Sequence, residues 1–388
     1  MSYILFNSVL KIFIFGNYGM IMIPINKPLI GKEEVEAINE VISSGILTSP
    51  SINGGPKVRE FESKFAGFIG SKYGVAVNSG TAALHLALLA AGIGPGDEVI
   101  VPPFTFIATA TVVLLTGAKP VFADINPETY NIDPEKVKRL ISPKTKAIIP
   151  VHLYGLPAEM DALMEIAKEH NIVVIEDAAQ AHGASYKGRM VGSIGDMGCF
   201  SFYATKNMTT GEGGMITTDN KEYWERLKML RSHGQVKGYD PHILGYNYRM
   251  PEIEAAIGLV QLSKLPRFLE IRRRNAMILN DLLSEFKDLR LPYEPTGVRH
   301  SWYLYTISVE NNRNILRDGL NKLGIGASVY YETPVHLTPL FYKMGFREGM
   351  YPAAEYASQH VLSLPIHPEL NENDMVFIYE SIKKMLVG

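Results

Sequence analysis

The chain has 388 residues, of which 46% are hydrophobic and 20% are charged, a composition typical of a soluble globular protein with room for two or three domains. Lys and Arg total 38 against 40 Asp and Glu, and no basic run carries interleaved aromatic residues, so we expect no nucleic-acid partner. Cys199 is the only cysteine, which excludes an intrachain disulfide and a cysteine-ligated iron–sulfur cluster. The 10 histidines show no metal-binding spacing, so we expect no catalytic metal.

Residues 1–22 differ from the rest of the chain. The stretch 4–15 is apolar with Lys11 inside it, which is too short to span a bilayer, and it lacks a clear positive leader and cleavage site. The domain pattern begins near Ile23. We therefore expect a cytoplasmic protein with no membrane partner, in which residues 1–22 reflect either an upstream choice of start codon or a packed extension.

The next part of the chain alternates short β-branched runs with amphipathic helices. Apolar residues of the stretch 160–167 recur with the spacing of one buried helix face. Such alternation predicts an α/β fold with a mostly parallel sheet between helices, in which ligands bind beyond the carboxyl ends of the strands. The expected strands are 75–77, 98–101, 120–123, 147–151, 172–175 and 215–218.

A different pattern follows Pro251. It predicts a helix running toward Phe286 with interruptions, including one at Pro266. The remaining chain predicts a smaller α+β domain, with strands at 302–309 and 327–331, a helix at 313–323 and a closing helix around 375–382. We therefore expect a large domain over residues 23–265 and a small C-terminal domain over residues 266–388.

The stretch 198–207 carries the strongest chemical signal. It is a short apolar strand pattern that ends at Lys206, and small turn-forming residues follow at 209–214. This arrangement suits an amine that sits inside a pocket and attacks a carbonyl. A surface lysine at a strand end would show the same local pattern.

The stretch 78–84 predicts a phosphate site. Small residues, including Gly80 and Thr81, follow the expected first strand and open a helix. The bare N–H groups of such a helix start bind a phosphate with little further help. A simple Ser/Thr helix cap is the alternative.

An acidic residue at the end of the strand pattern 172–175 is suited to holding a ring nitrogen. Asp177 is placed for this role, whereas Glu176 points to the opposite face if the strand persists. Asp177 could instead cap the next segment. Gln180, one turn further, could reach a phenolic oxygen of a bound ring.

Three further features are consistent with a site at this sheet edge. Phe106 follows another expected strand and could stack on a ring, although core packing is the commoner use of phenylalanine. The hydroxyl of Ser201 could donate to a phosphate. The loop 245–250 is either an ordinary hydrogen-bonded loop or a segment that reaches a neighbouring subunit's site.

Taken together, four motifs resemble the nucleotide-sugar aminotransferases of the DegT/StrS group. Their order and rough spacing match that family, and the resemblance runs from about Ile23 to the C-terminus. It implies the type I fold of pyridoxal-phosphate enzymes and a homodimer with composite active sites. The motifs are Ser-Gly-Thr-Ala-Ala-Leu (79–84), Glu-Asp-Ala-Ala-Gln (176–180), Phe-Ser-Phe-Tyr-Ala-Thr-Lys-Asn (200–207) and Gly-Tyr-Asn-Tyr-Arg-Met (245–250).

The resemblance also implies a role for each matching position. Lys206 would be the catalytic residue, covalently linked to pyridoxal 5′-phosphate (PLP). Arg249 and His336 would lie on the substrate side. The remaining residues would bind the cofactor: Gly80, Thr81 and Ser201 at the phosphate, Phe106 on the ring face, Asp177 at the ring nitrogen, Gln180 beside the phenolic oxygen, and Asn247 at the phosphate from the partner subunit.

The implied reaction is a transamination in two halves. L-Glutamate would convert PLP to pyridoxamine phosphate (PMP), which would then aminate the ketone of a nucleotide-linked keto-6-deoxy sugar. The segment 209–214 is similar to relatives that aminate position four. Residues 50–54 are an insertion relative to related sequences, in a loop that borders the substrate side in the family, so the sugar is not implied.

Two alternatives remain at this stage. One is a PLP- or PMP-dependent sugar dehydrase, although those relatives carry a histidine where this chain has Lys206. The other is a non-catalytic sensor or regulator that binds sugar nucleotides, which would need an effector domain or a DNA-reading surface that the sequence does not show.

Overall fold

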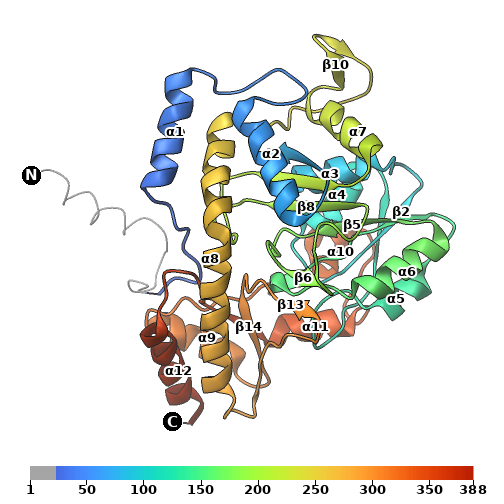
Figure 1. Ribbon diagram of the computed structural model, residues 1–388. Helices are drawn as coiled ribbons and strands as arrows, with labels where there is room; N and C mark the ends of the chain where they lie inside the picture. Colours follow the sequence, from blue (N-terminus) through green and yellow to red (C-terminus); the bar gives the residue numbers. More distant parts are fainter. Residues whose placement is uncertain (1–22, 388) are drawn as a thin grey trace, which may run out of the picture.

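The computed structural model describes residues 23–387, so the predicted extension 1–22 lies outside the described residues. A seven-stranded sheet with strand order β1-β9-β8-β5-β4-β2-β3 forms the centre of the larger part (Figure 1). Strand β9 runs antiparallel to both of its neighbours, and the other strand pairs are parallel, which confirms the expected fold class. The strands are β1 (Tyr73–Val77), β2 (Glu98–Val101), β3 (Lys119–Phe122), β4 (Thr145–Ile148), β5 (Val173–Asp177), β8 (Met197–Ser201) and β9 (Gly214–Thr218).

Helices cover both faces of this sheet because successive strand side chains point to opposite faces. In β1, for example, Ala76 belongs to one core cluster, while Val75 and Val77 belong to the other. The first cluster packs under α2 (Pro56–Ile69), α5 (Pro134–Leu140) and α6 (Met160–His170). The second packs under α3 (Gly80–Ala90), α4 (Ala108–Leu115) and α7 (Lys221–Arg231).

The long helix α8 (Glu252–Leu283) links the two parts of the molecule (Figure 1). It continues through Pro266, so the interruption expected there is absent. Leu265 packs in the core under α2 and α6, whereas Leu279 packs in the core of the C-terminal part. The expected boundary near residue 265 therefore falls inside one continuous helix. Helix α1 (Lys32–Ser44) packs along the same helix.

The C-terminal part is built around β12 (Leu289–Arg290), β14 (Tyr305–Val309) and β15 (Val361–Leu364), with α9 (Arg313–Lys322) and α12 (Glu372–Val387). The expected strand 327–331 is wrong: only Ser328 bridges, to Ser363, and the chain then turns away. β14 pairs with β12 on one side and with β15 on the other, and β15 follows α11 (Pro352–His360) directly. Ile23 bridges Ile325 and joins this C-terminal core.

Short elements complete the described chain. Among the described residues, no helix combines the length and the apolar character that a membrane span requires. The remaining elements are η1 (Leu153–Gly155), β6 (Ser185–Tyr186), β7 (Arg189–Met190), β10 (Gln235–Lys237), β11 (Asp240–Pro241), β13 (Val298–Arg299), η2 (Val335–Leu337) and α10 (Pro339–Lys343).

Candidate active site

A cavity of about 830 Å³ opens beyond the carboxyl ends of the central strands, where α/β sheets bind their ligands. Tyr303, Tyr330 and Tyr331 bring the C-terminal part of the chain into its wall. The structure thus gathers most of the predicted site residues around one space. Those residues are Gly80, Thr81, Phe106, Asp177, Gln180, Ser201 and Lys206.

One end of the cavity is the start of helix α3. Ser79 caps the helix by accepting a hydrogen bond from the Ala82 N–H at 3.1 Å. The first N–H groups of a helix have no partner within it, so those of Gly80 and Thr81 are available to a ligand. A Cβ on Gly80 would lie 2.7 Å from the Ser201 Cβ, so only glycine fits here. The predicted cap and the predicted anion site are therefore compatible.

Asp177 ends strand β5 and borders the cavity while remaining 5% exposed. Its Oδ2 accepts from the Thr109 hydroxyl at 2.9 Å, and its Oδ1 accepts from the Ala179 N–H at 3.2 Å. Burial raises the pKa of Asp177, and the Thr109 hydrogen bond opposes that shift. The carboxyl is thus held in place with little water around it.

Glu176 points to the opposite face of β5, as the strand alternation predicts. Its Oε1 accepts from the N–H groups of Ile194 and Gly195, both at 2.7 Å. Its Oε2 accepts from the Gly192 N–H at 2.7 Å and from His152 Nε2 at 3.0 Å. The side chain is fully buried, and these donors surround its negative charge.

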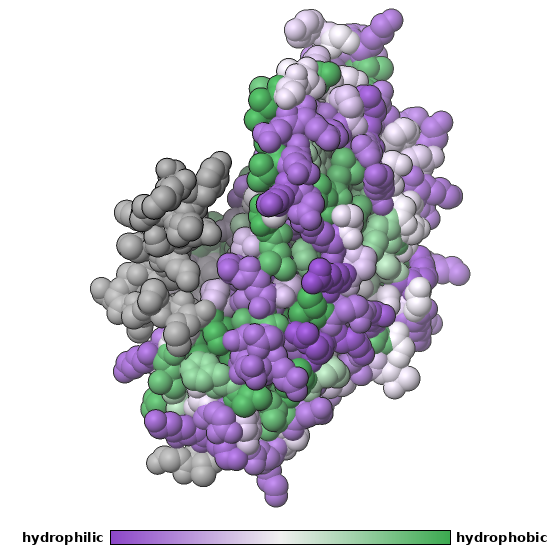
Figure 2. All heavy atoms as spheres, turned by 60° about the vertical axis from the view of Figure 1, so that its left-hand side comes forward, coloured by the Kyte–Doolittle hydropathy of each residue, from purple (hydrophilic) through white to green (hydrophobic). Residues whose placement is uncertain are grey.

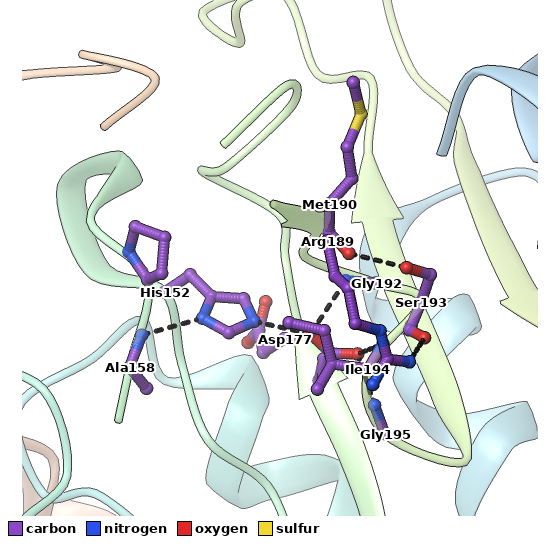
Figure 3. Close-up of polar contacts among 12 residues, drawn as sticks. His152, Ala158, Asp177, Arg189, Met190, Gly192, Ser193, Ile194 and Gly195 are labelled. Carbon is purple, nitrogen blue, oxygen red and sulfur yellow. Dashed lines mark hydrogen bonds and ion pairs between the residues drawn. The ribbon is translucent and has the colours of Figure 1, made fainter. Parts of the chain in front are cut away.

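The His152 ring fixes this arrangement. Its Nδ1 accepts a hydrogen bond from the Ala158 N–H at 3.0 Å (Figure 3), so the ring proton is on Nε2, which lies 3.0 Å from Glu176 Oε2. The backbone N–H of His152 donates to the Asp177 carbonyl, and the Asp177 N–H donates to the Pro150 carbonyl. Glu176 and His152 therefore hold the end of β5 so that Asp177 faces the cavity.

Lys206 lies in the cavity wall and is half-buried, which favours the pocket lysine over the surface lysine. Its Nζ lies 4.6 Å from the centre of the Tyr303 ring. The Tyr303 hydroxyl is 3.1 Å from Thr205 Oγ1, so the residue before the lysine is tied to the ring beside its amine. Tyr303 was not predicted as a site residue, because only the fold brings it here.

Gln180 and Phe106 take different positions on the wall. Gln180 accepts from the Tyr154 N–H at 2.8 Å and donates to the Tyr331 hydroxyl at 3.0 Å. Phe106 is 54% exposed, and its ring centre lies 6.4 Å from that of Tyr331. Phe106 is therefore open to a ligand and is not packed into the core.

The other predicted site residues lie outside the cavity lining of the single chain. Asn247 bridges Ser232, and Arg249 bridges Val77 at the edge of the sheet. His336 is fully buried, its Nε2 is 3.0 Å from Glu355, and burial lowers the pKa of the ring. In this chain, His336 offers a substrate no surface.

The loop 50–54 is anchored on helix α7. Arg231 donates to the Ile52 carbonyl at 2.8 Å, and Lys228 donates to Asn53 at 3.1 Å. None of these loop residues lines the cavity described above. The same part of the chain, residues 23–387, holds no cluster of three His, Cys, Asp or Glu side chains placed to bind a metal ion.

Comparison with known proteins identifies the family of this chain. The profile of the DegT/DnrJ/EryC1/StrS aminotransferase family matches residues 28–383. The chain belongs to this family. It is therefore an aminotransferase, and the cavity beyond the carboxyl ends of the central strands is its candidate active site.

Three relatives are similar over most of their length. Spore coat polysaccharide biosynthesis protein SpsC of Bacillus subtilis is 41% identical, with 94% of this chain and 97% of the relative covered. A pleiotropic regulatory protein of Geobacillus stearothermophilus is 46% identical, with 84% and 89% covered. UDP-N-acetyl-3-dehydro-alpha-D-glucosamine 3-aminotransferase of Acidithiobacillus ferrooxidans is 43% identical, with 88% and 92% covered.

Solved structures of this family share the fold. DesV of S. venezuelae, solved with a ketimine intermediate, is 39% identical and superposes with a TM-score of 0.88, covering 91% of this chain and 94% of that chain. Spr1654 of Streptococcus pneumoniae in its PLP form is 32% identical with a TM-score of 0.88, covering 93% and 98%.

Glu176→Gln is the sharpest test of the support beneath Asp177. In either orientation of the new amide, its NH₂ group would face two N–H donors. His152 cannot relieve this, because its Nδ1 accepts from the Ala158 N–H and its proton therefore stays on Nε2. We expect the free energy of unfolding to fall by about 2–5 kcal/mol, measured by urea denaturation. Ser193→Ala, which removes only a local bond from the same loop to the Met190 carbonyl, should lose about 1 kcal/mol or less. Equal losses in the two variants would contradict the assignment.

Proposed function

We propose that this protein is a PLP-dependent aminotransferase that moves the amino group of L-glutamate to the ketone of a nucleotide-linked sugar. One observation carries the proposal: Lys206, Asp177 and the start of α3 face a single cavity. A primary amine, a buried carboxyl and an anion-binding helix start are the complement of an aldehyde, a pyridine nitrogen and a phosphate.

The residues present fit PLP. The N–H groups of Gly80 and Thr81 and the Ser201 hydroxyl would hold the phosphate, and Gly80 has no room for a side chain. Asp177 would hold the ring nitrogen, Gln180 would lie beside the phenolic oxygen, and Phe106 would cover a ring face. When bound, PLP supplies the electron sink that stabilises negative charge at the carbon carrying the amino group.

The protein's own residues carry out the proton transfers. The Lys206 amine would form the covalent link with loss of water and, once an amino donor displaces it, would accept a proton at Nζ from the donor carbon and give it up again. Asp177 would keep a proton on the ring nitrogen of the bound group, because a carboxylate in a dry environment attracts such an N–H strongly. The Tyr303 ring lies 4.6 Å from Nζ and covers the amine on one side.

The nucleotide-sugar substrate is proposed from the relatives. One relative is named for amination at carbon 3 of a UDP-sugar, whereas the segment 209–214 resembles enzymes that aminate position four. We favour a 4-keto-6-deoxy sugar as acceptor and assign L-glutamate as donor. Assays of purified protein with 3-keto and 4-keto sugar nucleotides decide the carbon.

A homodimer is part of the proposal, because it would bring Asn247 of one subunit to the phosphate of the other and Arg249 to the substrate. Helix α1 and its flanking segments expose apolar side chains on the face turned forward in Figure 2, and such a face suits a subunit interface. The exposed residues there are Ile30, Val35, Ile42, Ile46 and Leu47.

A sugar-nucleotide sensor is the second candidate, because one relative is named a pleiotropic regulatory protein. The two functions predict different absorbance of the protein when PLP is added. An aminotransferase should turn yellow with PLP and lose that absorbance when L-glutamate is added. A protein that remains colourless with PLP and still binds a sugar nucleotide would be the sensor.

Lys206→Ala tests the catalytic assignment. The variant keeps the phosphate and ring contacts, so we expect it to bind PLP, while turnover falls by several orders of magnitude because one amine performs the covalent and proton-transfer steps. Turnover is followed as formation of 2-oxoglutarate from L-glutamate. Lys187→Ala, which removes an exposed lysine paired with Asp161, is the control and should keep full activity. Wild-type turnover in Lys206→Ala would contradict the assignment.

Asp177→Asn separates stability from function. Because burial raises the pKa of Asp177, its charged form disfavours folding at neutral pH, and this penalty vanishes below the ordinary aspartate value of 3.8. An amide can accept from Ala179 and donate to Thr109, which then donates to Thr105 at 3.0 Å. We expect the cofactor-free variant to melt at or above the wild-type temperature at pH 7, with no difference at pH 3.

The same substitution should weaken PLP binding by about 10-fold or more, because the ring nitrogen loses its charged partner. Fluorescence titration with PLP measures this affinity. Unchanged affinity would mean that Asp177 only caps the segment after β5.

A further inference from the structure

Arg272 is buried in a way that the proposed reaction does not explain. Its side chain in α8 is 2% exposed, and burial lowers its pKa to about 10. Across residues 23–387 it forms no ion pair with a carboxylate. The other deeply buried arginine, Arg231, is paired with Glu62 in the usual way. A buried guanidinium without an acid is costly, so its contacts identify what it does.

The Nη donors of Arg272 go to backbone and amide oxygens near Lys206, whereas its Nε has no hydrogen-bond partner among the described residues. Nη1 donates to the carbonyls of Trp302 at 3.3 Å and Tyr303 at 3.1 Å, and Nη2 donates to Asn26 Oδ1 at 3.0 Å. Asn26 then donates through Nδ2 to the carbonyl of Thr205, the residue before the lysine. A continuous chain of hydrogen bonds thus runs from α8 to the peptide group that precedes Lys206.

The Arg272 guanidinium also fixes Tyr303, whose ring lies beside the Lys206 amine. By holding the Tyr303 carbonyl it fixes the residue whose ring lies 4.6 Å from Nζ and whose hydroxyl is 3.1 Å from Thr205 Oγ1. Arg272 does not line the main cavity, and the space that it shares with Lys206 on the far side is only about 10 Å³. It therefore has no room to bind a substrate itself.

We propose that Arg272 and Asn26 are positioning residues that aim the Lys206 amine into the cavity, a role that rests on the proposed PLP function. Asn26 fixes the backbone before the lysine, and Arg272 fixes both Asn26 and Tyr303. The planar fork of arginine reaches these separate acceptors at once, which the single ammonium of a lysine cannot do. Misplacement of a reacting group by about 1 Å can cost about 100-fold in rate.

Asn26→Asp is the most discriminating test, because it should disturb the position of the Lys206 amine while leaving the stability of the fold nearly unchanged. The new carboxylate can pair with the otherwise acid-free Arg272, so we expect a melting temperature close to that of the wild type. It cannot donate to the Thr205 carbonyl and repels it, so the lysine loses its backbone support. A purely structural role for Asn26 would move stability and chemistry together.

The readout is the rate at which the cofactor-free protein links to PLP. The Nζ–carbon bond forms with loss of water, and borohydride then adds a hydride, so the modified Lys206 can be counted by mass spectrometry. We expect Asn26→Asp and Arg272→Lys to link about 10- to 100-fold more slowly than the wild type. In steady-state assays, kcat should fall while KM for the sugar nucleotide stays within about twofold.

Two controls complete the experiment. Arg273→Lys changes the next residue of α8, whose half-buried side chain pairs with Glu294, and should link at the wild-type rate. Asn26→Ala removes all three side-chain hydrogen bonds of Asn26, which join it to Thr205, Arg272 and the N–H of Lys27, and its rate is corrected for the folded fraction. Wild-type linking rates in Asn26→Asp, or losses that track only the folded fraction, overturn the inference. A wild-type protein that never links to PLP refutes the proposed function instead.

Discussion

The site depends on two adjacent carboxyl groups at the end of β5 that point in opposite directions. Glu176 is surrounded by N–H donors from the loop 192–195 and by the proton of His152. Asp177 faces the cavity with two donors of its own. Because side chains alternate along a strand, the burial of one carboxylate sets the direction of the other. A shift of one residue in this strand would exchange the two groups.

The start of α3, Asp177 and Lys206 are each held at the cavity by a different kind of contact. The start of α3 is a backbone feature, so it depends on a helix cap and on a glycine that lies against Ser201. Asp177 is held by the hydroxyl of Thr109 in α4 and by the N–H of Ala179 just after β5. Lys206 is positioned by side chains from the N-terminal segment, α8 and the residues before β14. The lysine therefore has the most distributed support of the three.

This difference explains what could be predicted from the sequence. The helix start, Asp177 and Lys206 each lie at the end of a local strand pattern, so short motifs sufficed to predict that they line one cavity. Tyr303 and Arg272 could not be found in this way, because their contacts join positions far apart in the chain. Chemistry-bearing residues scattered over a sequence give no periodic signal.

Two of the predicted elements are wrong because of tertiary contacts. The stretch 327–331 has the composition of a strand, but the chain forms a single bridge there and then sends Tyr330 and Tyr331 to the cavity. Pro266 is expected to interrupt a helix, yet α8 continues past it with both of its halves anchored in hydrophobic cores. In both places tertiary packing outweighs local preference.

The path of the chain also sets the order in which this pocket can come into being. Residues from the beginning of the described chain and from beyond residue 300 meet around Lys206, with α8 between them. A nascent polypeptide still attached at residue 290 has the lysine but not the tyrosine that shields it. On the proposed function, coenzyme capture would therefore be a late event, and acquisition of colour would mark a chain whose synthesis and folding are finished.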